Sequence, residues 1–385
     1  MQLQQLNSIS EIDPAEWDRL AGDDALYSHA WLSTVEACTF EQPRFLYLLA
    51  RVNGTLLGAA ACQIRLGNEP AWLDKAFYGR ASGVARATGF GATPAIAVGS
   101  RFGFSPPFIF DPSLSALQVD EIAETFILRI VERAELMKAS VMLRNTKLGM
   151  FVPALSRARF VATPDVPTTY IDIRWNAFAD FRRDLKKIHP ATEKAIRNQT
   201  NRAKRDGIVV ERVTDPALLS AGLHEVLDAH YRRLNGISLP VGDSFLSEAF
   251  RRLGDHADLT VARDASGVLG VHFALRRGGV SQALLVGTST ERARTTDTYF
   301  LLLNHVMHRA IESGDRRLYF GRLLYEVKLR RGFSIEQSMI WIRGRSKLQR
   351  AGLKRLVPIR SMKIERMINA LEPASQANAA ALHGR

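Results

Sequence analysis

The segment FGRLLYEVKLRRGF, residues 320–333, concentrates side chains that could bind an anion and support catalysis. If the residues after its Phe-Gly pair form a helix, a spacing of three places Tyr325, Lys328 and Arg331 along one face. A lysine ammonium there could hold a phosphate, a substrate carboxylate or a developing oxyanion. We therefore interpret Lys328 and Tyr325 as candidate catalytic residues, with Arg322 and Arg331 binding an anionic substrate. The alternative is a solvated surface on which the lysine stem packs and the charge stays in water.

His272, in the stretch GVHFAL, is the candidate general base. An imidazole with a pKa near neutral can take a proton from an attacking amine. The alternative is a hydrogen-bonded core histidine within a strand. The chain shows no Ser/His/Asp or Cys/His arrangement and no spacing of metal ligands, so we expect neither a covalent enzyme intermediate nor a metal.

Two cysteines, Cys38 and Cys62, are too few for a disulfide framework and fit a reducing compartment. The start of the sequence lacks the basic and apolar regions of a secretory signal, and no window approaches the length of a membrane span. We expect a cytoplasmic protein without stable membrane insertion.

The charge is high and unevenly distributed. The formal net charge is +13 and the pI about 10.0. Residues 182–205 carry nine Lys/Arg against two acids, and residues 343–366 carry nine against one. Two such segments are typical of an anion-binding surface, although each could also be a solvated helix face. Within the first segment, helical spacing predicts a stripe that could follow a phosphate backbone, which Pro190 could interrupt. The stripe consists of Arg183, Lys187, Lys194 and Arg197.

A hairpin pattern occurs twice. The stretch RFLYLLARVNGTLLGAAACQIRL places Asn53-Gly54 between apolar runs, which predicts two strands joined by a tight turn. The stretch DLTVARDASGVLGVHFALRRGGVSQALLVG repeats this plan and adds a third strand. The two copies are separated by about the length of a whole domain, and a single repeat at such a distance indicates a duplicated domain.

Helical patterns surround both hairpins, at residues 119–139 after the first and 298–313 after the second, with a short strand beyond residue 314. The order predicts an α+β fold of two domains, each a mostly antiparallel mixed sheet flanked by helices. We expect the domains at 1–165 and 166–345. A basic amphipathic segment follows at 346–370, and a disordered tail is expected at 371–385.

Three stretches resemble the GNAT acyltransferase fold, and more narrowly the CelD-like acyltransferases and the related Fem-type transferases that use aminoacyl-tRNA. These are EKAIRNQTNRAKRDGIVVERV, ARDASGVLGVHFALRRGGVSQALLVGTST and AIESGDRRLYFGRLLYEVKLRRGF, which together cover roughly residues 185–340. The third contains the K-x-x-x-G-F of both groups, and the resemblance gives its lysine, Lys328, a place in the donor or acceptor channel. The first half of the chain resembles the family only in plan.

The resemblance also bears on the donor. GNAT enzymes that use coenzyme A usually carry a Gln/Arg- and Gly-rich loop that holds the pyrophosphate at a helix N-terminus. Here the corresponding ERARTTDTYF keeps Arg292 and Arg294 but has neither glycine, and Asp297 is either a helix cap or a carboxylate close to the phosphates. This departure favours aminoacyl-tRNA over acyl-CoA as the donor.

The sequence thus predicts an N-acyltransferase in which the second domain forms an amide from aminoacyl-tRNA and the amine of a small-molecule or cell-wall-type acceptor. We expect no cofactor beyond the co-substrate, and tRNA as a partner. An acyl-CoA-dependent GNAT enzyme is the first alternative. A non-catalytic RNA- or membrane-binding protein is the second, in which residues 346–370 lie on a membrane surface unless Pro358 breaks the helix.

Overall fold

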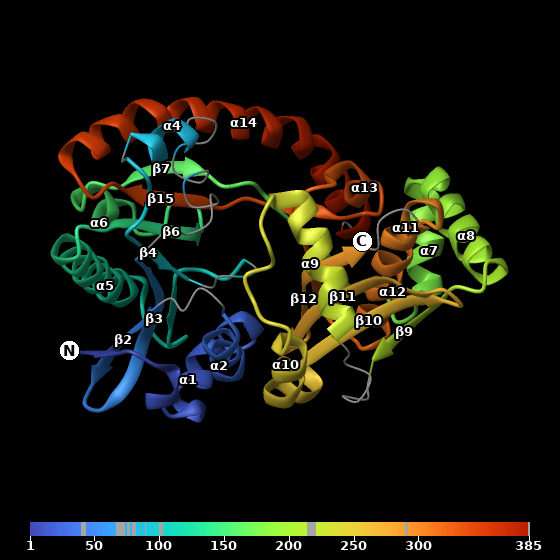
Figure 1. Ribbon diagram of the computed structural model, residues 1–385, viewed down its shortest axis with the longest axis horizontal. Helices are drawn as coiled ribbons and strands as arrows, with labels where there is room; N and C mark the ends of the chain where they lie inside the picture. Colours follow the sequence, from blue (N-terminus) through green and yellow to red (C-terminus); the bar gives the residue numbers. More distant parts are fainter. Residues whose placement is uncertain are drawn as a thin grey trace.

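The computed structural model shows two mixed β-sheets side by side, each flanked by helices (Figure 1). It describes residues 1–39, 44–66, 74, 78, 82–88, 90–99, 102, 104–213, 221–288 and 292–383. The predicted α+β fold, with two mostly antiparallel mixed sheets flanked by helices, is confirmed.

The first sheet has eight strands, in the order β1-β2-β3-β4-β6-β15-β7, with β5 paired to β3. All neighbours are antiparallel except β4 and β6. The strands are β1 (Gln2–Leu6), β2 (Arg44–Val52), β3 (Thr55–Arg65), β4 (Ala95–Val98), β5 (Phe108–Phe110), β6 (Ser140–Thr146), β7 (Val161–Pro164) and β15 (Met339–Arg343).

The second sheet has seven strands, in the order β14-β8-β13-β12-β11-β10-β9. Here β12 and β13 form the parallel pair. The strands are β8 (Thr168–Asp172), β9 (Val209–Val213), β10 (Ala257–Asp264), β11 (Gly267–Arg277), β12 (Val280–Thr288), β13 (Arg317–Gly321) and β14 (Ser334–Glu336).

Helices cover both sheets, and the last helix spans both domains (Figure 1). The helices are α1 (Pro14–Ala21), α2 (His29–Cys38), α4 (Ser82–Ala87), α5 (Ala116–Leu136), α6 (Val152–Arg157), α7 (Phe178–Ile188), α8 (Pro190–Arg205), α9 (Ala221–Asn235), α10 (Phe245–Leu253), α11 (Arg292–Thr295), α12 (Thr298–Glu312), α13 (Tyr325–Leu329) and α14 (Lys347–His383).

Both predicted hairpins form. β2 and β3 pair in antiparallel register around Asn53 and Gly54, which adopt φ of 50° and 84° as the tight turn requires. In the second domain β10, β11 and β12 form the predicted meander, and α12 ends one residue before the expected boundary.

One hydrophobic cluster contains buried residues of both domains. Trp31 of α2 stacks on Phe273 of β11 and meets Phe245 of α10 edge-on, with centroids 6.4 and 6.0 Å apart. The turn between β11 and β12 also lies against the first domain, where a Cβ on Gly278 would collide with the carboxylate of Asp23. The domains are therefore held in a fixed relation, and a site between them has defined walls.

The C-terminal residues depart from the predicted boundaries. β15 does not belong to the second sheet: it crosses back and pairs with β6 and β7 of the first. Residues 371–383, predicted to be disordered, continue α14, where Ser375 and Asn378 are buried. The Asn378 amide donates to the carbonyls of Leu329 and Phe333 at 2.7 Å. The prediction of disorder is wrong because the packing of these small residues on the second domain compensates for their low apolar content.

Candidate functional site

The best-defined site of the second domain is a gap between its two parallel strands. β12 and β13 are paired only from Val280–Arg317 to Gln282–Tyr319, and they then separate. Residues 283–286 of β12 and 320–322 at the end of β13 line a cavity of about 190 Å³, which we call the strand-gap cavity. The chain leaves β13 through Gly321, Leu323 and Leu324, all at positive φ. Two consecutive leucines in this conformation are strained, and such strain is concentrated at functional sites.

Lys328 lies in the wall of the strand-gap cavity, with only 2% of its surface exposed. Its Nζ donates to the carbonyl oxygens of Phe320 and Arg322, at 2.7 and 3.2 Å. No ion pair joins it to an acid among the described residues. Burial without a counter-charge lowers the lysine pKa to about 7. Lys328 can therefore exchange a proton near neutral pH.

His272 lines the same cavity and is fully buried. Its ring stacks on Phe320 with centroids 5.3 Å apart, and its Nδ1 has no hydrogen-bond partner among the described residues. Burial lowers its pKa to about 4, with the nearby Lys328 acting in the same direction. A base this weak has less driving force for proton transfer than Lys328.

Tyr325 and Arg331, which were predicted to share a helix face with Lys328, do not line the strand-gap cavity. Tyr325 donates its hydroxyl proton to the carbonyl of Pro167 at 2.6 Å, and burial raises its pKa to about 12. The guanidinium of Arg331 lies over the ring of Phe300, 5.1 Å from its centroid. α13 is only five residues long and packs between other segments of the protein. Residues three apart in the sequence therefore contact different parts of the structure. The phenol that does line the cavity is Tyr299, whose pKa burial raises to about 12.

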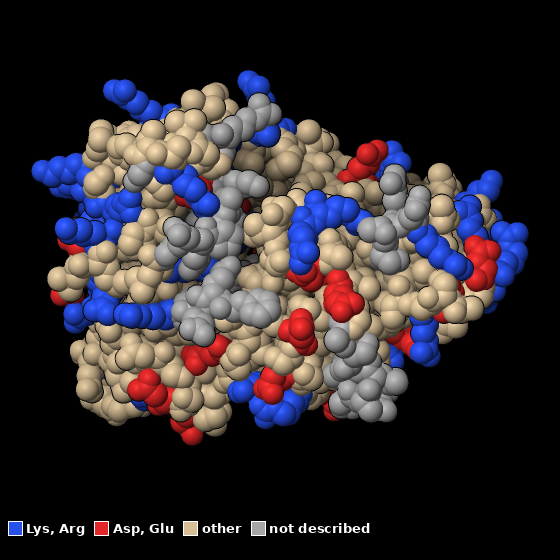
Figure 2. All heavy atoms as spheres, viewed as in Figure 1, with Lys and Arg blue, Asp and Glu red and all other residues tan. Residues whose placement is uncertain are grey.

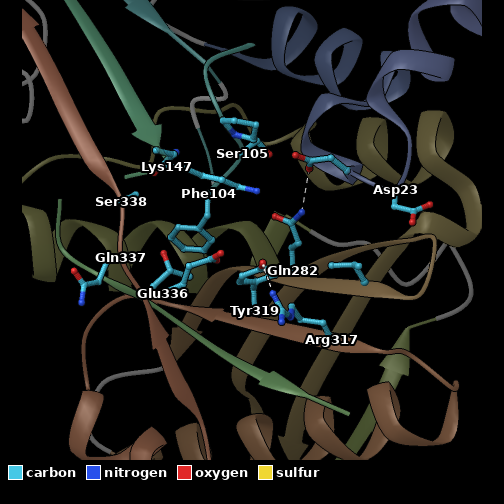
Figure 3. Close-up of a pocket in the computed structure, with 15 residues that line it drawn as sticks. Asp23, Phe104, Ser105, Lys147, Gln282, Arg317, Tyr319, Glu336, Gln337 and Ser338 are labelled. Carbon is cyan, nitrogen blue, oxygen red and sulfur yellow. Dashed lines mark hydrogen bonds between the residues drawn. The ribbon is translucent and has the colours of Figure 1, made fainter. Parts of the chain in front are cut away.

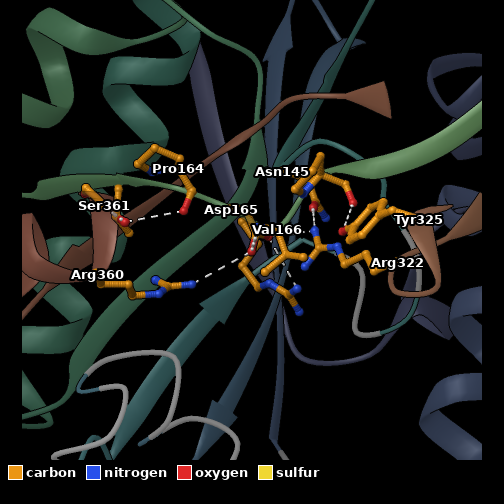
Figure 4. A network of polar contacts seen from close by, with 11 residues as sticks. Asn145, Pro164, Asp165, Val166, Arg322, Tyr325, Arg360 and Ser361 are labelled. Carbon is orange, nitrogen blue, oxygen red and sulfur yellow. Dashed lines mark hydrogen bonds and ion pairs between the residues drawn. The ribbon is translucent and has the colours of Figure 1, made fainter. Parts of the chain in front are cut away.

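Arg322 joins the site to the boundary between domains (Figure 4). It lines the strand-gap cavity and pairs with Asp165 at 2.6 Å, while also donating to Asn145 of β6 at 3.0 Å. Arg144 and Arg360 approach the same carboxylate at 3.5 and 3.9 Å. Burial acts to raise the pKa of Asp165, but the arginines outweigh it and the pKa is lowered. One carboxylate therefore connects both domains, their linker and α14.

A second cavity, of about 300 Å³, lies between the domains (Figure 3). We call it the interdomain cavity. Carboxylates of Asp23, Asp24 and Glu336 line it, together with the cations of Lys147 and Arg317. Burial raises the pKa of Asp24, which accepts a hydrogen bond from Gln282 at 3.1 Å.

Phe104 connects the two cavities, because it lines both. Its ring also lies over the Arg322 guanidinium, with the centroid 5.4 Å away. The strand-gap cavity, which has Lys328 in its wall, therefore adjoins the interdomain cavity at this residue.

The basic segment 182–205 forms two helices rather than one. α7 ends just before His189, and α8 begins with Pro190. Proline at the first position of a helix removes no hydrogen bond, so the chain can turn here at little cost. The predicted continuous stripe is thus divided between two helices.

The four cations of this stripe differ in their surroundings. Arg183 and Lys187 form ion pairs, at 3.0 and 2.8 Å, with aspartates one turn earlier on α7. Lys194 and Arg197 on α8 are exposed and have no ion pair with a described residue. Other residues of α8, among them Ala195 and Gln199, line a third cavity of about 500 Å³ whose walls include Arg331. The α8 pair is therefore the part of the stripe available to a ligand.

The segment before α12 differs from a phosphate-binding loop. Asp297 takes the N-cap position at φ 55°, but its carboxylate makes no cap hydrogen bond and pairs with Arg202 at 3.1 Å. Arg292 pairs with Asp264 at 2.6 Å. The side chain of Arg294 lies outside the described residues, as do residues 289–291.

The described residues contain no group of three or more His, Cys, Asp or Glu placed to hold a metal ion. None of the described helices is long and apolar enough to cross a membrane.

Known proteins resemble this chain in fold. Residues 191–329 match the acetyltransferase (GNAT) domain family. The chain is similar to the crystal structure of FemX, at 12% identity over 88% of this chain and 96% of that one, with a TM-score of 0.55. It is also similar to the C-terminal domain of a lysylphosphatidylglycerol synthetase from Agrobacterium fabrum, at 11% identity over 91% of this chain and 97% of that one, with a TM-score of 0.52. L-PGS from Bacillus licheniformis is similar at 12% identity over 94% of this chain and 99% of that one, with a TM-score of 0.50. No curated protein matches the sequence.

Sequence reasoning missed Asp165, Asn145, Tyr299 and the carboxylates of the interdomain cavity. Asp165 left one signal, since it is the single charged residue of the Pro-rich stretch VATPDVPTTY. The others come from segments remote in sequence, and no local pattern marks them.

Proposed function

We propose that this chain, in which residues 191–329 match the acetyltransferase (GNAT) domain family, transfers an aminoacyl group from aminoacyl-tRNA to an amine and forms an amide. The acceptor is a small-molecule or cell-wall-type amine. One main observation supports this assignment: a buried lysine with a pKa near 7 lines the strand-gap cavity, which shares Phe104 with the interdomain cavity.

The reaction is an aminolysis of an ester. It needs a deprotonated amine, a stabilised tetrahedral oxyanion and two oriented reactants. In the proposal, the acceptor binds as an ammonium and first releases one proton to solvent. The neutral amine of Lys328 then takes the second proton as the amine attacks the ester carbonyl. The resulting ammonium then stabilises the oxyanion, and the leaving ribose oxygen takes up the proton.

The free cations of α8 support tRNA as the donor. Lys194 and Arg197 are exposed on α8. Other residues of this helix line the cavity that contains Phe300 and Arg331, a ring and a guanidinium on which a base can stack. Binding of coenzyme A is disfavoured, because the carboxylate of Asp297 lies at the start of α12 and repels a pyrophosphate there.

We expect tRNA affinity to fall with salt at a log–log slope of about −2 to −4. Lys194→Ala and Arg197→Ala should each reduce the steepness by about one. Arg183→Ala and Lys187→Ala are matched controls that should change it less, since both cations already have ion-pair partners. Filter binding over a salt series measures the slopes.

The runner-up donor, acyl-CoA, is tested in the same system. Acyl transfer from a synthetic acyl-CoA that proceeds unaffected by ribonuclease and by the α8 substitutions would decide against tRNA. Such a result would leave the acyltransferase assignment intact.

The interdomain cavity is the proposed acceptor site, because its carboxylates attract a protonated amine. We expect Glu336→Gln to raise the acceptor KM about fivefold, or about 1 kcal/mol, with kcat little changed. Glu211→Gln, on the opposite edge of the same sheet, is the control. Steady-state kinetics with the acceptor varied measures both; equal KM values for the two variants would place the acceptor elsewhere.

A further inference from the structure

The outward face of α14 carries exposed apolar side chains in a regular row. Leu348, Ile359 and Met362 are 66%, 62% and 50% exposed. Together with Arg355 and Arg366, their spacing of three, four or seven residues places them on one side of the helix. We call this row the α14 stripe. The opposite side, with Leu353, Val357 and Ile368, is buried against the protein.

The sequence left open whether Pro358 breaks the helix, and it does not. α14 runs continuously from Lys347 to His383 and arches over both domains along the upper edge of the molecule (Figure 1). The Pro358 ring is itself exposed. A carbonyl freed by its missing N–H on that side can bond to water.

The apolar surface extends beyond the helix. Val84 and Phe90 are exposed beside the start of α14. With Leu348 and Leu356 they border a largely apolar hollow of about 460 Å³. Single exposed apolar residues are normal, but a contiguous patch marks an interaction surface.

The patch is bordered by cations. Residues 347–366 contain seven Lys/Arg and one acid, Glu365. Five of these cations are exposed and have no ion pair with a described residue: Lys347, Lys354, Arg355, Lys363 and Arg366. Figure 2 shows blue side chains projecting from the tan surface at this edge.

We propose that the α14 stripe docks the protein on an anionic membrane surface. The combination of apolar residues and flanking cations fits such a surface, where the apolar side chains enter the headgroup boundary and the cations face the phosphates. A nucleic acid would pair with the cations but would leave Ile359 and Met362 without apolar contacts. The proposal concerns peripheral binding and is independent of the acyl donor.

The test is flotation of the full-length protein with vesicles. Vesicles of phosphatidylcholine with about a third phosphatidylglycerol should bind the protein, and pure phosphatidylcholine vesicles should bind at least about tenfold less. The double variant Ile359→Glu/Met362→Glu should lose at least about tenfold of the binding to the anionic vesicles. Both positions are exposed, and circular dichroism checks that the variant is folded.

A matched control is Leu117→Glu/Leu136→Glu, which changes two exposed leucines of α5 by the same chemistry and should bind like the unmodified protein. Equal loss in both double variants, or binding independent of lipid charge, would overturn the proposal. The proposal would also be overturned if the unmodified protein were a dimer and Ile359→Glu/Met362→Glu were a monomer. The α14 stripe would then be an interface between copies of this chain. Displacement by tRNA, with binding unaffected by the stripe substitutions, would assign the cations to RNA.

Discussion

Lys328→Met is expected to reduce kcat/KM at least about 100-fold, the lower end of what a general acid–base contributes. Methionine preserves the length and apolar stem of the side chain but removes the amine. The substitution leaves the carbonyls of Phe320 and Arg322 without their donor, so a loss of about 1–3 kcal/mol in stability should accompany it. Unfolding monitored beside the kinetics separates the two effects.

The pH dependence gives a second reading of the same residue. With a pKa of about 7, Lys328 is protonated in acid and neutral in mild base. If the neutral amine accepts the proton, kcat/KM should rise with pH and level off above about 7. A rate that falls through this range would indicate that the ammonium, as a fixed charge, is the active form.

Lys328→Arg distinguishes the two roles independently. Arginine keeps the positive charge but does not release its proton near neutral pH. We expect this variant to be as impaired as Lys328→Met. Substantial activity in Lys328→Arg would reject proton transfer by this residue, and full activity in folded Lys328→Met would remove Lys328 from the site.

Asp165→Asn is expected to lower the free energy of unfolding by about 3–5 kcal/mol. Its carboxylate is the shared ion-pair partner of Arg144, Arg322 and Arg360, and only 2% of its side chain is exposed. The amide would leave three guanidinium groups close together without a counter-charge. Urea denaturation measures the change. Glu326→Gln, which breaks an exposed ion pair with Arg330, is the control and should cost less than about 1 kcal/mol.

The stability difference should depend on pH in one direction. Because the arginines lower the Asp165 pKa in the folded protein, its contribution is full well above the unfolded value of about 3.9. It is lost as the pH falls through the folded pKa. The unmodified protein and Asp165→Asn should therefore converge in acid, and a constant difference down to low pH would show that the charge is not the cause.

Local patterns in the sequence determined the hairpins and the main helices. Asn53-Gly54 predicts its turn because only residues tolerant of positive φ fit there, and the meander and α12 follow from alternation and helical spacing. A short motif gave Lys328, by resemblance, a place in the donor or acceptor channel, and Lys328 lines a cavity. Each of these features depends on residues that are neighbours in the chain.

Tertiary structure decided the composition of the site. Tyr325 and Arg331 have the spacing of a shared face, yet one reaches Pro167 and the other Phe300, because contacts on either side of the short α13 outweigh helical periodicity. The return of β15 to the first sheet, the ordering of residues 371–383 and the convergence of three arginines on Asp165 all depend on contacts between segments that are separated in the sequence. The pKa of Lys328 has the same origin. A sequence specifies the amine, but only the packing around it removes water and every counter-charge, and that desolvation lowers the pKa to about 7.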